Sequence, residues 1–286
     1  MDEDFDDYSR KERVDHIHIS DQIEKIGLSG GNEVIVAGIA QHTTSLSGTE
    51  GIMNALGKVV QEKGAEDVVF LGEGSAVTVG VIKKSLGEAI LGGDQQAMAY
   101  RAKELGIKQI DSWDMSMEEQ LATASSSFGA ENALLWMVSQ SAIHLNDQGQ
   151  TINMKNILQM LNRFGMTKEK IVNALGDPNI SKVLESEETI DRFLITRAGF
   201  SLTAVNTNDE NYRQLSQVAF PSNTDADINR LPEDLRVAAT VGKGLSEERD
   251  KRFVQKIKQY SEEGKTMFVS CGGGHVDSFS EKLQDL

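Results

Sequence analysis

The fold is decided by Thr266-Met-Phe-Val-Ser-Cys-Gly-Gly-Gly-His275, an apolar run that breaks into three glycines and ends on a histidine. Glycine allows a turn at positive φ and lets a ligand approach the backbone closely. A histidine at the carboxyl end of such a strand lies where ligands bind in open α/β sheets. The same order of residues occurs in Glu33-Val-Ile-Val-Ala-Gly-Ile-Ala-Gln-His42. Because the chain has only 5 histidines, we expect the fold to bring His42 and His275 together.

The composition limits the classes of protein to which the chain can belong. Its 286 residues carry a formal net charge of −15, and phosphate binding needs clustered Lys and Arg, which argues against nucleic acid and anionic membranes as partners. The single cysteine, Cys271, rules out an intramolecular disulfide and fits a reducing compartment. No apolar run approaches the roughly 18 residues of a membrane span, and the acidic N-terminus has no signal-peptide stretch. We therefore expect a cytoplasmic protein without a membrane span.

The alternation of apolar strands with amphipathic helices predicts an α/β fold, with a mostly parallel sheet flanked by helices. Strands are expected at 16–19, 34–40, 67–72, 108–114 and 266–270, and helices at 49–60, about 77–90, 95–105, from 246 onward and at 276–285. Between about 117 and 220 nearly everything is predicted to be helical, beginning at a capping box formed by Ser116 and Glu119. The segment 221–244 is predicted to be a turn-rich connection.

This pattern predicts a single α/β domain over residues 21–286, with a large helical insertion in the middle of the chain at about 117–220. Residues 1–20 are predicted to be an acidic, disordered tail. The helical insertion is a candidate lid, a candidate homodimer interface, or both.

Three predicted strand ends deliver His42, Glu73 and His275. Imidazole and carboxylate groups bind Zn, Mn, Co or Fe(II) and leave positions open for water, whose pKa the metal lowers. Glu73 is alternatively a general base. Each histidine is alternatively an ordinary hydrogen-bonded structural residue.

Several motifs occur in the order in which one protein superfamily has them. They are Val34-Ile-Val-Ala-Gly-Ile-Ala-Gln-His42, Val68-Val-Phe-Leu-Gly-Glu73, Ala97-Met-Ala-Tyr-Arg-Ala-Lys-Glu-Leu-Gly-Ile-Lys108 with Asp111-Ser-Trp-Asp114, and Glu247-Glu-Arg-Asp250 before Cys271-Gly-Gly-Gly-His275. In these stretches the chain resembles the TraB/PrgY/Tiki/ChaN-like superfamily, which includes GumN-like proteins and, more distantly, erythromycin esterases. The first turn, from Gly38 to His42, is one residue longer than the Gly-x-x-His of that family.

The resemblance implies roles for individual residues. His42, Glu73 and His275 would be metal ligands for Mn, Co or Zn, and Glu73, Glu248 and Arg249 would be catalytic. Arg249, near a helix start, would clamp a substrate carboxylate or phosphate. Without the family, the favoured interpretation of Glu248 and Arg249 is an ordinary first-turn acid and a surface arginine.

Two classes of function follow. The first is a metal-dependent hydrolase of a peptide, an ester or a related small molecule. The second is a binding or regulatory protein of the TraB (pheromone-shutdown) type, which sequesters a peptide or small ligand without turnover. Neither glycine turn matches a nucleotide-binding motif, and no Gly-x-Ser-x-Gly elbow is present. Cys271 is a candidate nucleophile or soft ligand, but a small buried strand residue is the favoured interpretation.

Overall fold

The structure, a computed structural model, describes residues 22–39, 49–74, 82, 84–91, 93–147, 149–163, 165–219, 228–284 and 286. Its contacts divide the chain into two compact units. The first unit contains the described residues up to Asp114 together with Arg249–Leu286, and the second contains Met115–Glu248. The predicted acidic tail, the predicted strand at 16–19 and His42 lie outside the described residues.

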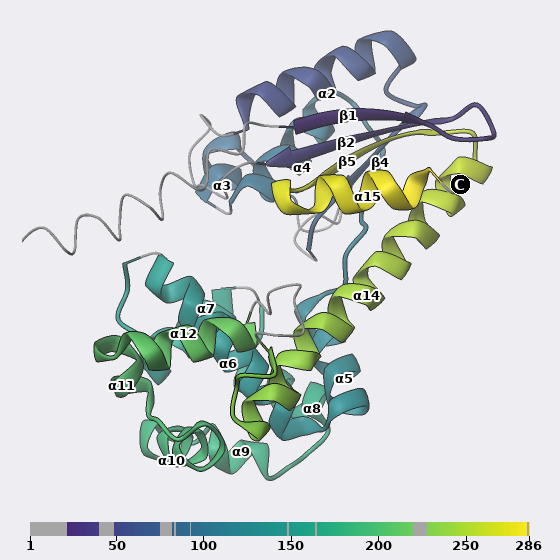
Figure 1. The fold of residues 1–286 in the computed structure, drawn as a ribbon. Coiled ribbons are helices and arrows are strands. Elements are labelled where there is room, and N and C mark those ends of the chain that lie inside the picture. The colour runs from purple at the N-terminus through teal and green to yellow at the C-terminus, as the bar shows by residue number, and fades with distance from the viewer. Residues whose placement is uncertain are drawn as a thin grey trace, which may run out of the picture. The chain divides into compact units, whose positions relative to one another are not determined.

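The first unit is built on a five-stranded sheet with the order β1-β2-β5-β3-β4 (Figure 1). Its strands are β1 (Gln22–Gly27), β2 (Glu33–Ile39), β3 (Val68–Gly72), β4 (Gln109–Ser112) and β5 (Thr266–Gly272). Strands β2, β5, β3 and β4 run parallel, and β1 pairs with β2 in the antiparallel direction. The prediction of an α/β fold with a mostly parallel sheet is confirmed. The antiparallel edge strand β1 was not predicted.

Both faces of this sheet are covered by helices, as parallel sheets require. Along β5, Phe268 packs with α2 (Glu50–Lys63) and α4 (Asp94–Glu104), whereas Met267 and Val269 pack on the opposite face. That opposite face is covered by the C-terminal half of α14 (Glu233–Glu262) and by α15 (Val276–Leu283) (Figure 1). The unit also contains α3 (Leu86–Leu91) and the 3₁₀ turn η4 (Gly273–His275).

Within its described residues the second unit contains helices and the turns that join them, and no strand. Its helices are α5 (Met117–Phe128), α6 (Ala130–Asp147), α7 (Met154–Arg163), α8 (Lys168–Leu175), α9 (Ile180–Val183), α10 (Glu187–Ala198), α11 (Leu202–Thr207), α12 (Asp209–Ala219) and the start of α14. The predicted capping box is present, because Ser116 Oγ accepts from the Glu119 amide and Glu119 Oε2 accepts from the Ser116 amide at 2.7 Å. These helices share one apolar core.

Two expectations about local structure were wrong. Helix α14 begins at Glu233, within the segment predicted to be turn-rich. A helix tolerates the glycines at 242 and 244, and the second of them packs against Phe128. Gly38 lies inside β2 without a positive φ, and Gly272 has a φ of −65°. These glycines therefore permit close packing rather than a left-handed turn.

Candidate functional site

The carboxyl ends of the parallel strands place four polar side chains of the first unit in one network. Glu73 directly follows β3, Asp114 follows β4 by two residues, and His275 ends the turn after β5. Arg249 joins them from α14. Because parallel strands end at the same edge, residues far apart in sequence meet there, as ligand sites in open α/β sheets do.

Arg249 lies at the centre of this network. Its Nε donates to Asp114 Oδ1 at 2.6 Å and its Nη2 donates to Asp114 Oδ2 at 2.9 Å, a bidentate pair. Nη2 also donates to Glu73 Oε1 at 2.9 Å. Burial lowers the pKa of the guanidinium, but the two carboxylates outweigh it and raise the pKa above its ordinary value. Arg249 is therefore permanently charged and held in one orientation.

Glu73 connects the ends of two strands. Its Oε2 accepts from the Gly272 amide at 3.0 Å, and its own amide donates to Gln95 Oε1 at 3.1 Å. With Arg249 on Oε1, both carboxylate oxygens have protein partners. The side chain is nevertheless 20% exposed, so a small molecule can reach it.

His275 is the most accessible member of the network. Its Nε2 lies 4.0 Å from Glu73 Oε1, and its side chain is 28% exposed. Burial is the main cause that lowers the pKa of His275, and Arg249 lowers it further, whereas Glu73, Asp250 and Asp114 raise it. The net result is a pKa below the ordinary value, which favours the neutral imidazole, the form that can accept a proton.

Trp113 is a site residue that the sequence analysis did not single out. It is fully buried, and its ring contacts both His275 and Arg249. In the sequence it is the residue before Asp114, just after the strand Gln109-Ile-Asp-Ser112, where a buried aromatic is equally the pattern of a core residue. No local signal separates the two roles.

The structure brings together some of the site residues that the sequence predicted, but not all of them. Glu73, Arg249 and His275 come together, while His42 lies outside the described residues. Glu248 is exposed in the middle of α14 and is the last residue of the second unit. Neither Glu248 nor Arg249 opens a helix, so the expected helix-terminus charge does not act on them. Cys271 is fully buried, and burial first, then Glu73, raises the pKa of its thiol, as fits the predicted small strand residue.

A divalent metal does not fit the residues that the structure describes here. Among them, no group of three or more His, Cys, Asp or Glu side chains is arranged to hold a metal ion. Glu73 and His275 supply two ligands, but the Arg249 guanidinium already occupies Glu73 Oε1. A dication at that oxygen would be repelled by the guanidinium at short range.

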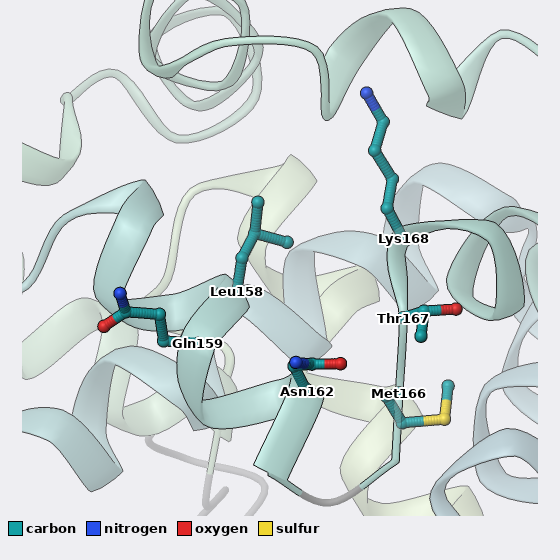
Figure 2. Close-up of a pocket in the computed structure, with 6 residues that line it drawn as sticks. All are labelled: Leu158, Gln159, Asn162, Met166, Thr167 and Lys168. Atoms are coloured by element: carbon teal, nitrogen blue, oxygen red, sulfur yellow. The ribbon is translucent and has the colours of Figure 1, made fainter.

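The second unit has a shallow hollow of its own, shown in Figure 2. Its volume is about 270 Å³, and it is lined by Leu158, Gln159, Asn162, Met166, Thr167 and Lys168, from α7 and the start of α8. Thr167 caps α8 by accepting from the Lys170 amide. None of the predicted site residues lines this hollow.

Comparison of the chain with protein-family models, with curated proteins and with solved structures found no match. The resemblance to the TraB/Tiki-like superfamily stays a prediction from the motifs. None of the helices among the described residues combines the length and apolar character needed to cross a membrane.

Proposed function

We propose that the protein is a hydrolase of a small ester, peptide or related molecule, and that the reaction takes place at the carboxyl edge of the sheet in the first unit. The observation that carries this proposal is the partly exposed His275 beside Glu73, 4.0 Å apart, at the edge where open α/β sheets bind ligands. A neutral imidazole next to a carboxylate is the arrangement that general-base catalysis uses.

The side chains of the site support one sequence of steps. Nε2 of His275 takes a proton from a water molecule, and the water oxygen forms a bond to the substrate carbonyl carbon. Arg249 stabilises the negative charge that develops on the carbonyl oxygen. Its Nη1 is suited to this, because it makes no hydrogen bond within the described part of the chain. The imidazolium then donates its proton to the leaving group as the scissile bond breaks, and Glu73 stabilises the imidazolium in the interval.

The metal-dependent form of this hydrolase, with His42, Glu73 and His275 as ligands for Mn, Co or Zn, stays a separate proposal. It requires a ligand outside the described residues and a rearrangement of Arg249. Metal content of the untagged protein, measured by plasma mass spectrometry beside His42→Ala and His275→Ala, tests it. Near-stoichiometric metal that is lost in both variants would support the metal site, and no metal after reconstitution would reject it.

A non-catalytic binding protein is the second candidate function, and one observation favours it. Both oxygens of Glu73 and two nitrogens of Arg249 already have protein partners, which is typical of a structural network. In that case a peptide or small ligand would bind at the edge without turnover, as the TraB resemblance implies.

Hydrolysis of a panel of p-nitrophenyl esters and fluorogenic peptides distinguishes the two candidates. His275→Gln should lower kcat/KM by about 10²–10⁴-fold, the usual contribution of a general base. His144→Gln is the matched control, because His144 is an exposed histidine of α6 in the second unit. Ligands that raise Tm without being hydrolysed would favour the binding protein, and equal activity of both variants would reject His275 as the base.

We also propose that helices α5–α12 are an insertion in the α/β unit that determines specificity. Sedimentation velocity of the full chain tests whether they form a homodimer interface.

A further inference from the structure

The ring of Trp113 contacts two residues of the proposed site, His275 and Arg249. Its ring centroid is 5.7 Å from that of His275, in an edge-to-face arrangement at 67°. The guanidinium carbon of Arg249 lies over the same indole, 5.6 Å from its centroid. An aromatic ring attracts a cation through its face and another ring through its edge. One rigid side chain thus sets the positions of both.

The indole itself is fixed from several directions. It is fully buried, and its Nε1 donates to the Ser270 carbonyl oxygen at 3.0 Å, which ties it to β5. Its backbone amide donates to the Gly72 carbonyl oxygen at 3.2 Å, which extends the pairing of β4 with β3. The ring also packs edge-on against Phe279, with the centroids 4.9 Å apart. Trp113 is therefore held in a fixed position relative to β3 and β5, two of the strands that end at the site.

The remaining aromatic rings of this cluster do not duplicate that role. Phe279 stacks on His275 at 5.3 Å, and Phe253 stacks on Phe279 at 3.8 Å. Within the described residues, neither phenylalanine carries a ring contact with Arg249. Phe279 supports one face of the imidazole, whereas Trp113 relates the imidazole to the guanidinium.

We infer that Trp113 is a positioning residue, which holds the His275 imidazole and the Arg249 guanidinium in the relative geometry that the reaction needs. This role rests on the proposed hydrolase function. Trp113 does not touch the substrate; it acts through the two residues that do. Replacement by phenylalanine keeps an apolar ring but removes the Nε1 bond to Ser270 and leaves room for the imidazole to rotate.

The kinetic test compares Trp113→Phe with Trp136→Phe. Trp136 is a matched control, because it is the other tryptophan, is equally buried, and lies in the second unit. We expect Trp113→Phe to lower kcat by about 10- to 100-fold, the order expected when reacting groups are misplaced by about 1 Å. KM should change by less than about twofold, because the loss falls on the chemical step. Equal kcat values for the two variants would overturn the role.

A second test does not depend on activity. In protein labelled at histidine, with His275 assigned by His275→Gln, the nuclear Overhauser effects between the His275 ring and Phe279, whose centroids are 5.3 Å apart, should weaken in Trp113→Phe and stay in place in Trp136→Phe. A merely structural tryptophan would lower Tm without changing these effects. The unmodified protein should show nuclear Overhauser effects between the indole and the His275 ring, a measurement that needs no variant to fold.

The two tests separate failure of the inference from failure of the proposed function. If the wild-type protein hydrolyses nothing while the His275–Phe279 effects weaken in Trp113→Phe alone, the hydrolase is rejected and the positioning of His275 by Trp113 is retained. If the effects between the indole and His275 are absent in the unmodified protein, or those between His275 and Phe279 are unchanged in Trp113→Phe, the positioning role is rejected whatever the activity.

Discussion

The side chains of Asp114 and Arg249 form a bidentate ion pair. The chain leaves the first unit at Asp114 and returns to it at Arg249. The pair therefore closes residues 115–248 into a loop whose ends are held together at the candidate site. Because Arg249 also binds Glu73, the same guanidinium that closes this loop orients the proposed catalytic carboxylate.

Replacing Arg249 with methionine should destabilise the protein by about 3–5 kcal/mol, because it breaks the bidentate ion pair of the buried Asp114 carboxylate by removing one side of it. The Asp114 side chain is only 4% exposed, so water cannot replace the guanidinium. The free energy of unfolding, measured by urea denaturation with circular dichroism, checks this.

Arg192→Met is the control for this variant. Arg192 pairs with Glu188 at 2.9 Å on α10, but these side chains are 72% and 82% exposed. Such a surface pair should contribute no more than about 0.5 kcal/mol. If the two variants lost the same amount of stability, the Arg249 network would be no more than a surface ion pair.

The sequence predicted the four parallel strands β2, β3, β4 and β5 and the edge that Glu73 and His275 share, because the strand signals are local. Runs of β-branched residues such as Val34–Ile39 identify buried strands, and Ser116 with Glu119 identifies a helix start. Once the strands are parallel, the residues after them must share one edge, which placed Glu73 and His275 together.

The remaining features depend on contacts between distant residues, for which a single sequence has no signal. Arg249 and Asp114 are separated by 135 positions. The glycines at 242 and 244 look like a turn until Phe128, from another helix, is seen against the second. Strand β1 was missed because Ile23 and Ile26 are three residues apart, which is not the period of a strand.

Gly38→Ala should destabilise the first unit by about 1–3 kcal/mol, the usual cost of overpacking a core. A Cβ at this position would lie 2.4 Å from Val276 Cγ2 and 3.0 Å from Gly273 Cα. The second contact is with backbone, which cannot move without shifting the turn that carries His275. Thermal denaturation of the variant measures the effect.

Gly57→Ala is the matched glycine substitution. Gly57 lies inside α2, and a Cβ there would meet no atom within 4 Å. Alanine should stabilise the helix by about 0.5–1 kcal/mol. Opposite signs for the two substitutions are expected, and destabilisation of equal size in both would contradict the packing explanation for Gly38.

Lys256→Met should lower the free energy of unfolding at neutral pH, and it should lower it by less in acid. Asp111 Oδ2 accepts from Lys256 Nζ at 2.5 Å and from the Tyr260 hydroxyl at 3.1 Å. Burial, the largest influence, raises the pKa of Asp111, but the bonds from Lys256, Ser112 and Tyr260 together lower it below its ordinary value. A carboxyl group whose pKa is lower in the folded state than in the unfolded state stabilises the fold at pH values above its unfolded-state pKa. This stabilisation is lost as the pH falls through the folded-state pKa.

The difference in unfolding free energy between wild type and Lys256→Met should therefore be about 1–3 kcal/mol at pH 7, and it should shrink below about pH 3.9, the ordinary value for aspartate. Lys258→Met is the control, since Lys258 is an exposed residue of the same helix. A difference that stays constant from pH 7 to pH 2 would show that Lys256 acts through packing alone.

The pH dependence of hydrolysis should identify His275 as the base. The acidic limb of kcat/KM reports the pKa of the essential base in the free enzyme, and burial together with Arg249 lowers the pKa of His275. We therefore expect the midpoint of this limb to lie below pH 6.5, the ordinary pKa of histidine.

Glu73 is the largest of the influences that raise the pKa of His275, so Glu73→Gln should move the acidic limb of kcat/KM to still lower pH. Glu50→Gln, at an exposed position of α2, should leave it in place. Complete loss of activity in Glu73→Gln, with His275→Gln still active, would instead make Glu73 the base.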